Sequence, residues 1–312
     1  MEGSRPFDAE VDFDQPRRSR APAPPPLPAA RGRRRRPREP GPPGSGGRRS
    51  ETIARIAWAV PWIAIAVTII IVGGELFAVA MLGLACVGLL ELFQMAKPAR
   101  PFLVLSFAAA AALAATAYYG SQFQMMIVLA ATGPALFFAA VVRPDREGIT
   151  VSIAITLLGL LWIAIPFAHA ILLRELPDHG AALLVDVLVG TFVTDTAAYA
   201  GGRMFGRHRL APALSPNKTF EGLAFGFVGG TLGFWFAGLY QDWLPGIDAL
   251  VMGMCVAALA PVGDLFESMI KRDLRIKDSG SIFGPHGGLL DRLDAVLFAI
   301  VAGYYLAIAF VY

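Results

Sequence analysis

From residue 53 to the C-terminus, apolar runs of about 20 residues alternate with short polar segments. A run of that length is what an α-helix needs to cross the hydrocarbon core of a bilayer. The pattern predicts an all-α polytopic membrane protein with about nine transmembrane helices. Only Gly73 and Gly74 separate the first two runs, so that boundary is the least marked. The predicted spans are 53–73, 75–95, 101–119, 123–142, 150–173, 181–200, 221–240, 248–268 and 292–312.

Lysine and arginine positions predict the orientation of these spans, because cytoplasmic loops carry an excess of both residues. With the N-terminus in the cytoplasm and nine crossings, Arg174 is the one basic residue in the outer loops. The inner loops then contain Lys97, Arg100, Arg143, Arg146, Arg203, Arg207, Arg209, Lys218 and the basic residues of 271–277. We therefore expect a cytoplasmic N-terminus and a C-terminus on the outer side.

Residues 1–50 differ in composition from the rest of the chain. They hold 11 of the 23 prolines and 12 of the 27 lysines and arginines, with hardly any large apolar residues. Such a segment cannot bury enough apolar surface to offset its ordering entropy, so it is predicted to be disordered. The arginines at 33–36 resemble a nucleic-acid patch. Next to a membrane span, however, they favour a role in topology, and no nucleic-acid partner is expected.

The membrane region divides into two predicted parts. Residues 51–180 carry little charge within their spans besides Glu91 and are interpreted as scaffold. Residues 181–312 include two long polar loops on the inner side, at roughly 201–220 and 269–291, and are interpreted as the catalytic region.

Charge is scarce in this chain and gathers in one segment. Charged residues make up 16% of the sequence, against about 25% in a typical soluble domain. Residues 268–294 nevertheless contain a dense group of cations, acids and glycines. Its charged members are Lys271, Arg272, Asp273, Arg275, Lys277, Asp278, Asp291, Arg292 and Asp294. Such a combination suits a site for phosphate and metal at a membrane surface.

Three carboxylates, those of Asp195, Asp264 and Glu267, lie inside predicted apolar helices. Ionisable residues in such positions are costly and are usually functional. Asp264 and Glu267 are one helical turn apart and share a face, and Asp291 and Asp294 repeat that spacing. The alternative is a set of buried ion pairs that hold the helices together.

The loop at 201–222 offers Ser215, Lys218 and Thr219 just before a helix that begins near Glu221. Hydroxyl and ammonium donors at a helix N-terminus are well placed for a phosphate group. An ordinary helix cap combined with topogenic charge is the alternative for this loop.

Two motif blocks stand out in the C-terminal half of the chain. The first comprises Asp195, Ala198, Tyr199, Gly202, Arg203, Phe205 and Gly206, followed by residues 215–219, Glu221 and Gly222. The second comprises Ser268, Ile270, Lys271, Arg272, Lys277, Asp278, Gly280, Phe283, Gly284, His286, Gly287, Gly288, Leu289 and residues 291–294, with Gly263 and Asp264 as a further element. These blocks resemble the phosphatidate cytidylyltransferase (CDP-diacylglycerol synthase) family. The resemblance is specific over about 190–300, with one departure, since Gly284 and Pro285 stand where many members have Pro-Gly.

The resemblance implies that CTP and phosphatidic acid react to give CDP-diacylglycerol and pyrophosphate, with Mg²⁺ as cofactor and a second cation left open. Carboxylate oxygens suit Mg²⁺, and the first candidate ligands are Asp264 and Asp291, followed by Asp195, Asp278 and Asp294. The candidate phosphate-binding residues are Ser215, Lys218, Thr219, Lys271, Arg272, Lys277 and Arg292. The candidate catalytic residues are Asp264, Asp291, Lys218, Lys277 and His286.

His286 admits two interpretations. It could act as a general base, or it could contact phosphate within the tight turn that its glycine neighbours indicate. The phosphate of the lipid substrate is already anionic at neutral pH, which favours the second interpretation.

Three other functions compete with this reading. An ion-coupled transporter would place its acids near the bilayer midplane between structural repeats, whereas here the charge gathers at the inner surface. A membrane scaffold explains the tail but not residues 268–294, and a lipid kinase differs in its nucleotide and product. We expect a multi-pass protein of a bacterial plasma membrane with a cytoplasmic active site, and a homodimer is left open.

Overall fold

The computed structural model describes residues 61, 63–145, 147–276, 279–280 and 287–312, which belong to one compact unit, Ile56–Tyr312. The N-terminal tail 1–50 lies outside the described residues. Helices dominate the described part, and the one sheet there is a two-stranded hairpin. The elements are α2 (Gly74–Met95), η1 (Lys97–Ala99), α3 (Leu103–Tyr119), α4 (Gln122–Val142), α5 (Ile149–Gly159), η2 (Leu160–Ala164), α6 (Ile165–Arg174), α7 (Gly180–Phe205), β1 (Arg209–Ala211), β2 (Ser215–Thr219), α8 (Phe220–Gly238), α9 (Gly246–Asp273) and α10 (Leu290–Phe310).

Seven of the described helical segments are long and apolar enough to cross a membrane. One of them is Ile149–Arg174, in which α5, the π-helical turn η2 and α6 run on without a break. Two shorter apolar helices, Ile63–Val72 and Leu103–Tyr119, occupy the other two predicted spans. Each predicted span therefore contains a helix, while the number of nine crossings remains a prediction.

The glycine pair between the first two helices makes a sharp turn. Gly73 has φ +64° and Gly74 has φ +59°, a left-handed backbone that residues with a Cβ adopt rarely. Arg174, at the end of α6, donates hydrogen bonds from Nε to the carbonyl of Ile70 at 2.6 Å and from Nη2 to that of Ile71 at 3.1 Å. The arginine thereby satisfies carbonyl groups that the end of the preceding helix leaves free.

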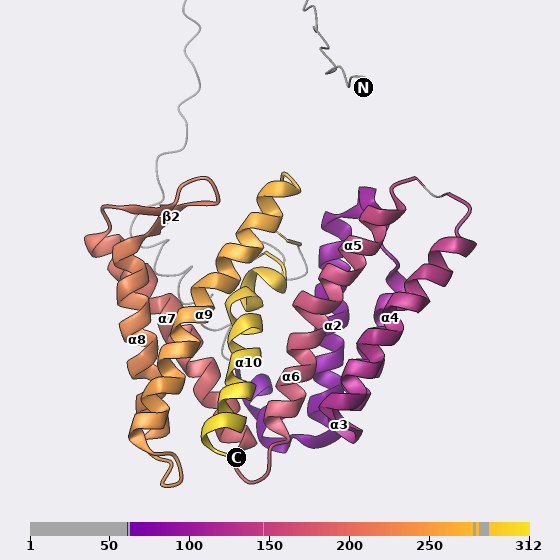
Figure 1. Cartoon of the computed structure of the whole chain (residues 1–312). Helices are drawn as coiled ribbons and strands as arrows, with labels where there is room; N and C mark the ends of the chain where they lie inside the picture. The colour runs from indigo at the N-terminus through magenta and orange to yellow at the C-terminus, as the bar shows by residue number, and fades with distance from the viewer. Residues whose placement is uncertain (1–60, 62, 146, 277–278, 281–286) are drawn as a thin grey trace, which may run out of the picture. The chain divides into compact units, whose positions relative to one another are not determined.

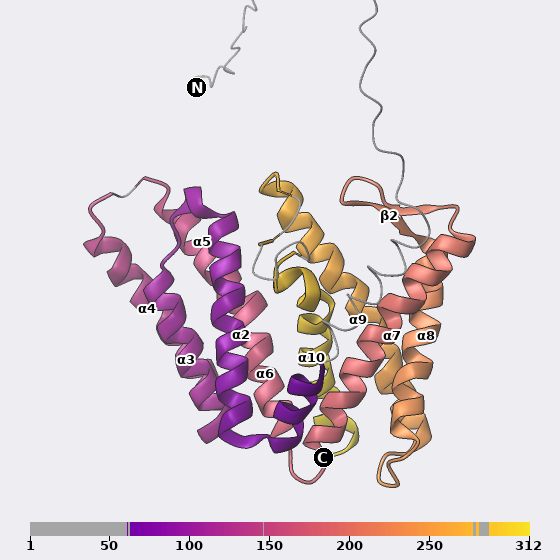
Figure 2. The same cartoon turned by 180° about the vertical axis from the view of Figure 1, so that it is seen from behind.

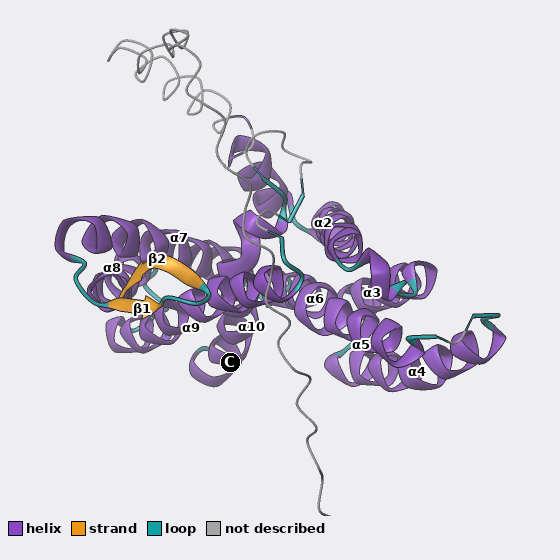
Figure 3. Ribbon diagram, turned by 90° about the horizontal axis from the view of Figure 1, so that it is seen from above, coloured by secondary structure: helices purple, strands orange, loops and turns teal. Residues whose placement is uncertain are grey.

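The helices form two groups that meet along α6 and α10. Viewed from above, α7, α8, α9 and α10 lie together on one side, and α2, α3, α4 and α5 lie on the other (Figure 3). Contacts are most extensive between α7 and α8, then between α8 and α9 and between α9 and α10. α6 packs against α10 as well as against α2 and α3. α6 therefore connects the two groups of helices.

Most polar connections gather at one end of the bundle. The β1–β2 hairpin, the C-terminal end of α9 and the α4–α5 connection are all at the upper end in Figure 1, and the chain ends at the opposite end. The reverse view shows the same arrangement (Figure 2). The basic loops predicted to share one membrane face thus share one end of the bundle. Which end faces the cytoplasm remains a prediction.

Candidate active site

The β1–β2 hairpin holds Lys218 against α9. Lys218 lies in β2, and its Nζ is 2.6 Å from Oδ2 of Asp264. β2 pairs antiparallel with β1, with Arg209 opposite Thr219 and Ala211 opposite Ser215. Because the hairpin leads directly into α8, Lys218 comes to lie over the neighbouring helix α9. The structure therefore joins the first motif block to Asp264.

Two side chains fasten the ends of this hairpin. Glu221, in the first turn of α8, accepts hydrogen bonds from the backbone N–H groups of Arg207 at 3.0 Å and His208 at 3.2 Å. Thr219 is the N-cap of α8, and its Oγ1 accepts a hydrogen bond from the N–H of Gly222 at 3.1 Å. Thr219 is also buried, and its hydroxyl serves as the cap of α8.

Lys271 connects α9 with α10. Its Nζ lies 2.7 Å from Oδ1 of Asp291 and 3.1 Å from Oε2 of Glu267, one turn earlier on the same helix. Glu267 is almost completely buried, with 1% of its side chain exposed. A charge in such a place is costly unless it is paired. The ammonium group of Lys271 is therefore shared between two carboxylates at the place where the two helices meet.

Asp291 is held from a second side by the segment that precedes α10. Its Oδ2 accepts hydrogen bonds from the N–H groups of Ser279 at 3.0 Å and Gly288 at 2.8 Å. Gly287 has φ +86°, and a Cβ there would come within 2.8 Å of the same Oδ2. The glycines of the second motif block thus let the backbone approach this carboxylate closely.

Acidic side chains from three helices surround these two lysines. Gly263 lies against the backbone of Asp294, so α9 and α10 approach closely there. Asp294 interacts electrostatically with Asp264 and Glu267, and Asp195 of α7 interacts with Asp264 and Lys218. These ion pairs and electrostatic interactions group five carboxyl groups with two ammonium groups. The site therefore has a surplus of potential negative charge that a cation could balance.

The donor set also suits a hard cation. Oε1 of Glu267 is buried and has no hydrogen-bond partner among the described residues. Within that part of the chain, no three His, Cys, Asp or Glu side chains are grouped closely enough to hold a metal ion by themselves. Mg²⁺ is typically bound through one or two carboxylates together with water and substrate phosphates. Asp264, Asp291 and Asp294 could supply such carboxylate oxygens.

The other candidate residues are placed as follows. Ser215 begins β2, and Arg272 donates a hydrogen bond from Nε to the carbonyl of Leu214 at 3.2 Å, which ties α9 to the hairpin. Arg292 is exposed in the first turn of α10. Lys277, Asp278 and His286 lie outside the described residues. The predicted site residues that the structure describes therefore gather near the C-terminal end of α9 and the N-terminal end of α10.

The sequence interpretation missed Glu91. This glutamate of α2 was assigned to the scaffold, but it is fully buried and accepts hydrogen bonds from Ser279, Leu289 and Leu290 at the start of α10. A lone carboxylate in an apolar helix was a signal in its own right. Its distance along the sequence from both motif blocks concealed the connection.

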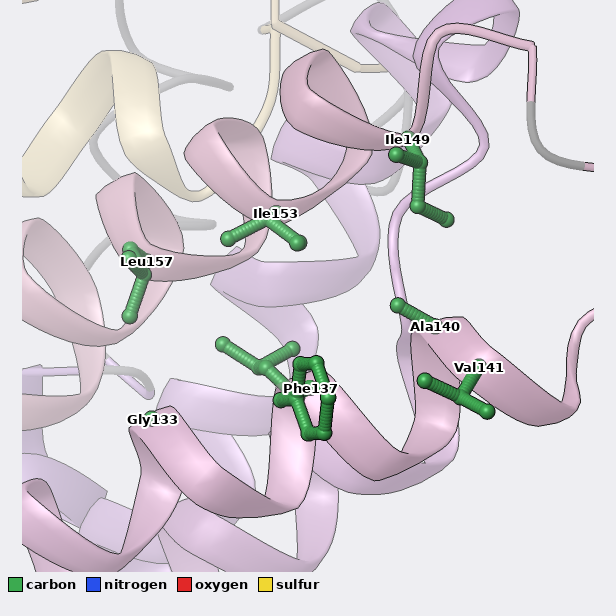
Figure 4. Close-up of a pocket in the computed structure, with 8 residues that line it drawn as sticks. Gly133, Phe137, Ala140, Val141, Ile149, Ile153 and Leu157 are labelled. Carbon is green, nitrogen blue, oxygen red and sulfur yellow. The ribbon is translucent and has the colours of Figure 1, made fainter.

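An apolar pocket of about 350 Å³ lies elsewhere, between α4 and α5. Figure 4 shows its lining, which includes Phe137, Ile149, Ile153 and Leu157. None of its lining residues is ionisable, and none belongs to the motif blocks. A pocket without polar groups cannot orient a nucleotide. The acidic cluster is the better candidate site.

Phosphatidate cytidylyltransferases of several bacteria are similar to this chain, two of them over more than two thirds of its length. A sequence model of the cytidylyltransferase family matches residues 53–310. A phosphatidate cytidylyltransferase of Synechocystis sp. is 31% identical over 290 residues, which are 81% of this chain and 96% of the relative. The phosphatidate cytidylyltransferase of Thermotoga maritima is 32% identical over 235 residues, or 72% of this chain and 84% of the relative. That of Bacillus subtilis is 36% identical over 154 residues, or 49% and 57%. The resemblance carried by the two motif blocks is confirmed, and the chain belongs to the cytidylyltransferase family.

Proposed function

We propose that this protein transfers CMP from CTP to phosphatidic acid, giving CDP-diacylglycerol and pyrophosphate. The relatives that match it over most of their length are phosphatidate cytidylyltransferases. The family match covers the described helices almost completely. Both observations support the same reaction on a lipid in the membrane.

The observation that carries the proposal is the pair of lysine–aspartate contacts. Lys218 of the first block reaches Asp264, and Lys271 reaches Asp291 within the second block. Asp294 interacts electrostatically with Asp264, and Arg272 is hydrogen-bonded to Leu214 beside β2, so the two motif blocks meet in one polar cluster. The lysines project from the hairpin and from α9, at the end of the bundle where the polar connections lie. A cluster of cations and carboxylates there is suited to polyphosphate and to a lipid headgroup at the bilayer surface.

The chemistry needs charge neutralisation more than proton transfer. An anionic oxygen of phosphatidic acid attacks the α-phosphorus of CTP and forms a new P–O bond. The bond between the α-phosphorus and the oxygen that bridges it to the β-phosphorus then breaks, and its electron pair leaves with pyrophosphate. No strong base is required, but two anions must be brought together. Fixed cations that face the negative charge developing on the phosphate oxygens stabilise the transition state in such sites.

The residues of the chain divide that task between them. Lys218 and Lys271 would bind phosphate oxygens. The ammonium group of Lys218 is held in place by Asp264, and that of Lys271 by Asp291. Arg272 and Arg292, at the adjoining helix ends, would add charge for the second phosphate-bearing substrate. One or two of the carboxylates of Asp264, Asp291 and Asp294, with Asp195 nearby, would hold Mg²⁺ together with water and substrate phosphates, and the ion would supply positive charge for the departing pyrophosphate. Lys277, Asp278 and His286 keep their sequence-based assignments.

The membrane setting fits this substrate. Phosphatidic acid can remain in the bilayer while its headgroup reaches the polar end of α9 and α10. Part of the proposal is that this end faces the cytoplasm, where CTP is available. The surplus of basic residues in the connections at this end supports that orientation.

The proposal is tested with detergent-purified protein, phosphatidic acid, Mg²⁺ and each of the four nucleoside triphosphates in turn. We expect pyrophosphate release with CTP, together with a lipid product heavier than phosphatidic acid by one CMP unit. A lipid that gains a phosphate from ATP would instead indicate a kinase. If no nucleotide changes the lipid, the proposal is wrong.

A further inference from the structure

Glu91 lies at the junction between the scaffold helices and the start of α10. It belongs to the last turns of α2, and its side chain is completely buried. Its Oε1 accepts a hydrogen bond from the N–H of Leu289 at 2.8 Å, and its Oε2 accepts one from the N–H of Leu290 at 2.9 Å. Oε2 also accepts one from the hydroxyl of Ser279 at 3.3 Å. One carboxyl group thus binds three donors that lie about 190 to 200 residues further along the chain.

This carboxyl group caps α10 from outside the helix. The first N–H groups of an α-helix have no partner within the helix, and a side chain at the N-cap position usually supplies one. The N-cap residue of α10 is Leu289, which makes no side-chain cap. Glu91 supplies the missing acceptor, at the helix end where negative charge is favourable.

The segment that precedes α10 fits closely against the carboxyl group of Glu91. A Cβ at Gly280 would come within 2.8 Å of Oε1 of Glu91, and a Cβ at Gly288 would come within 2.6 Å of Oε2. Both distances are too short for real Cβ contacts. Glycine at these two positions therefore permits the approach of the backbone to the carboxyl group.

Ser279 and α10 connect Glu91 with the candidate active site. Ser279 donates its hydroxyl to Glu91 and its backbone N–H to Asp291. Asp291 follows directly after Leu290, whose N–H is held by Glu91. The position of Asp291 relative to Lys271 therefore depends on two neighbours that Glu91 fixes.

We propose that Glu91 is a positioning residue for cytidylyl transfer, which aligns the first turn of α10 so that Asp291 meets Lys271. The inference rests on the function proposed above. Because Glu91 is buried, it acts through Ser279 and the start of α10 and not on the substrates. Helix α2, which belongs to the part of the chain interpreted as scaffold, thereby helps to set the geometry of the site.

The test compares Glu91→Gln with the control Glu75→Gln. The glutamine has nearly the same shape but replaces one acceptor oxygen with a donor group that faces the N–H and O–H donors. Glu75 lies exposed in the first turn of the same helix, and it accepts a hydrogen bond from Tyr119 at 2.9 Å. We expect kcat per folded molecule to fall at least ~10-fold in Glu91→Gln, with the KM for CTP changed far less, and to stay normal in Glu75→Gln.

Two further readouts separate positioning from simple stabilisation. Hydrogen exchange should become faster in a peptide that contains Leu289 and Leu290 in Glu91→Gln, while the peptides of α4 keep their rates. In addition, the double variant Glu91→Gln, Asp291→Asn should be no slower than Asp291→Asn alone. Glu91 acts by placing Asp291, so its loss has no further effect once Asp291 is replaced. Losses that multiply would show that Glu91 acts independently of Asp291 and would overturn the inference.

Each remaining outcome also decides the question. If Glu91→Gln does not fold, Ser279→Ala tests the same connection, since it removes one donor to Glu91 and keeps the backbone N–H to Asp291. It should lower kcat by a few-fold in the same direction. Normal kcat in the folded variants, with unchanged exchange at Leu289 and Leu290, contradicts the inference. If the wild-type protein transfers no CMP, the proposed function fails, and the exchange measurement still tests the positioning.

Discussion

The Nζ of Lys271 in α9 lies 2.7 Å from Oδ1 of Asp291 in α10. This contact joins two helices whose connection passes through the second motif block. It also places an ammonium group beside Glu267, which is buried. Its loss would therefore leave two carboxylates without their cation, at the place where we expect the phosphates of both substrates to meet.

Replacing this lysine should impair both catalysis and folding. Lys271→Met should lower kcat/KM at least ~10²-fold, the scale on which one electrostatic stabiliser acts. It should also lower the thermal midpoint in detergent, because the carboxylate of Glu267 would stay buried without its partner. Lys271→Arg keeps the charge and should retain more of both properties. Equal activity of Lys271→Met and the wild type would exclude Lys271 from the site.

Removing a carboxylate should change the response to Mg²⁺. Asp264→Asn and Asp291→Asn should each lose at least ~10²-fold in rate and need more Mg²⁺ for half-maximal activity. Asp248→Asn is the matched control, because Asp248 lies in the first turn of α9, at the opposite end of that helix from Lys271. Rates are measured over a Mg²⁺ titration. Two aspartate variants with wild-type rates and an unchanged titration would remove both residues from the metal assignment.

Thr219 offers a test of the hairpin. Its Oγ1 caps α8 through the N–H of Gly222, and loss of an N-cap costs about 1 kcal/mol. Thr219→Ala should therefore lower the thermal midpoint, whereas Thr219→Ser keeps the hydroxyl and should stay closer to the wild type. If the two variants have the same midpoint, the cap does not contribute to stability.

The N-terminal tail should be dispensable for catalysis. Residues 1–50 lack the apolar residues needed for a core. A protein without residues 2–50 should insert in the same orientation, because most of the remaining basic residues lie in the later connections. Its kcat and its KM for CTP should match those of the full chain. Correctly inserted protein with a much lower kcat would show that the tail takes part in the reaction.

Hydropathy predicted the helices well because it reports directly on transfer into the bilayer. For α4 the predicted span 123–142 and the observed helix Gln122–Val142 differ by one residue. The predicted ends of α7 and α9 were too early, at 200 and 268, whereas the helices continue to Phe205 and Asp273. Backbone hydrogen bonds can continue a helix into polar sequence, so the end of an apolar run does not mark the end of the helix.

The site was only partly visible in the sequence. The motif blocks predicted Lys218, Lys271, Asp264 and Asp291, and the structure brings these residues together. The short β1–β2 hairpin was read as a loop, since strands of three and five residues leave little periodicity. Glu91 was missed because its partners are almost 200 residues away, and only the packing of α2 against the start of α10 makes the contact.

The most direct test of the central claim follows the α-phosphorus of CTP. Purified protein is given phosphatidic acid, Mg²⁺ and CTP labelled at that atom, with Lys271→Met as a parallel sample. We predict that the label enters the lipid, that one pyrophosphate appears for each lipid labelled, and that the variant shows little of either. If the lipid stays unlabelled while the wild-type protein consumes CTP, or if the lipid gains the terminal phosphate instead, the proposed cytidylyl transfer is contradicted.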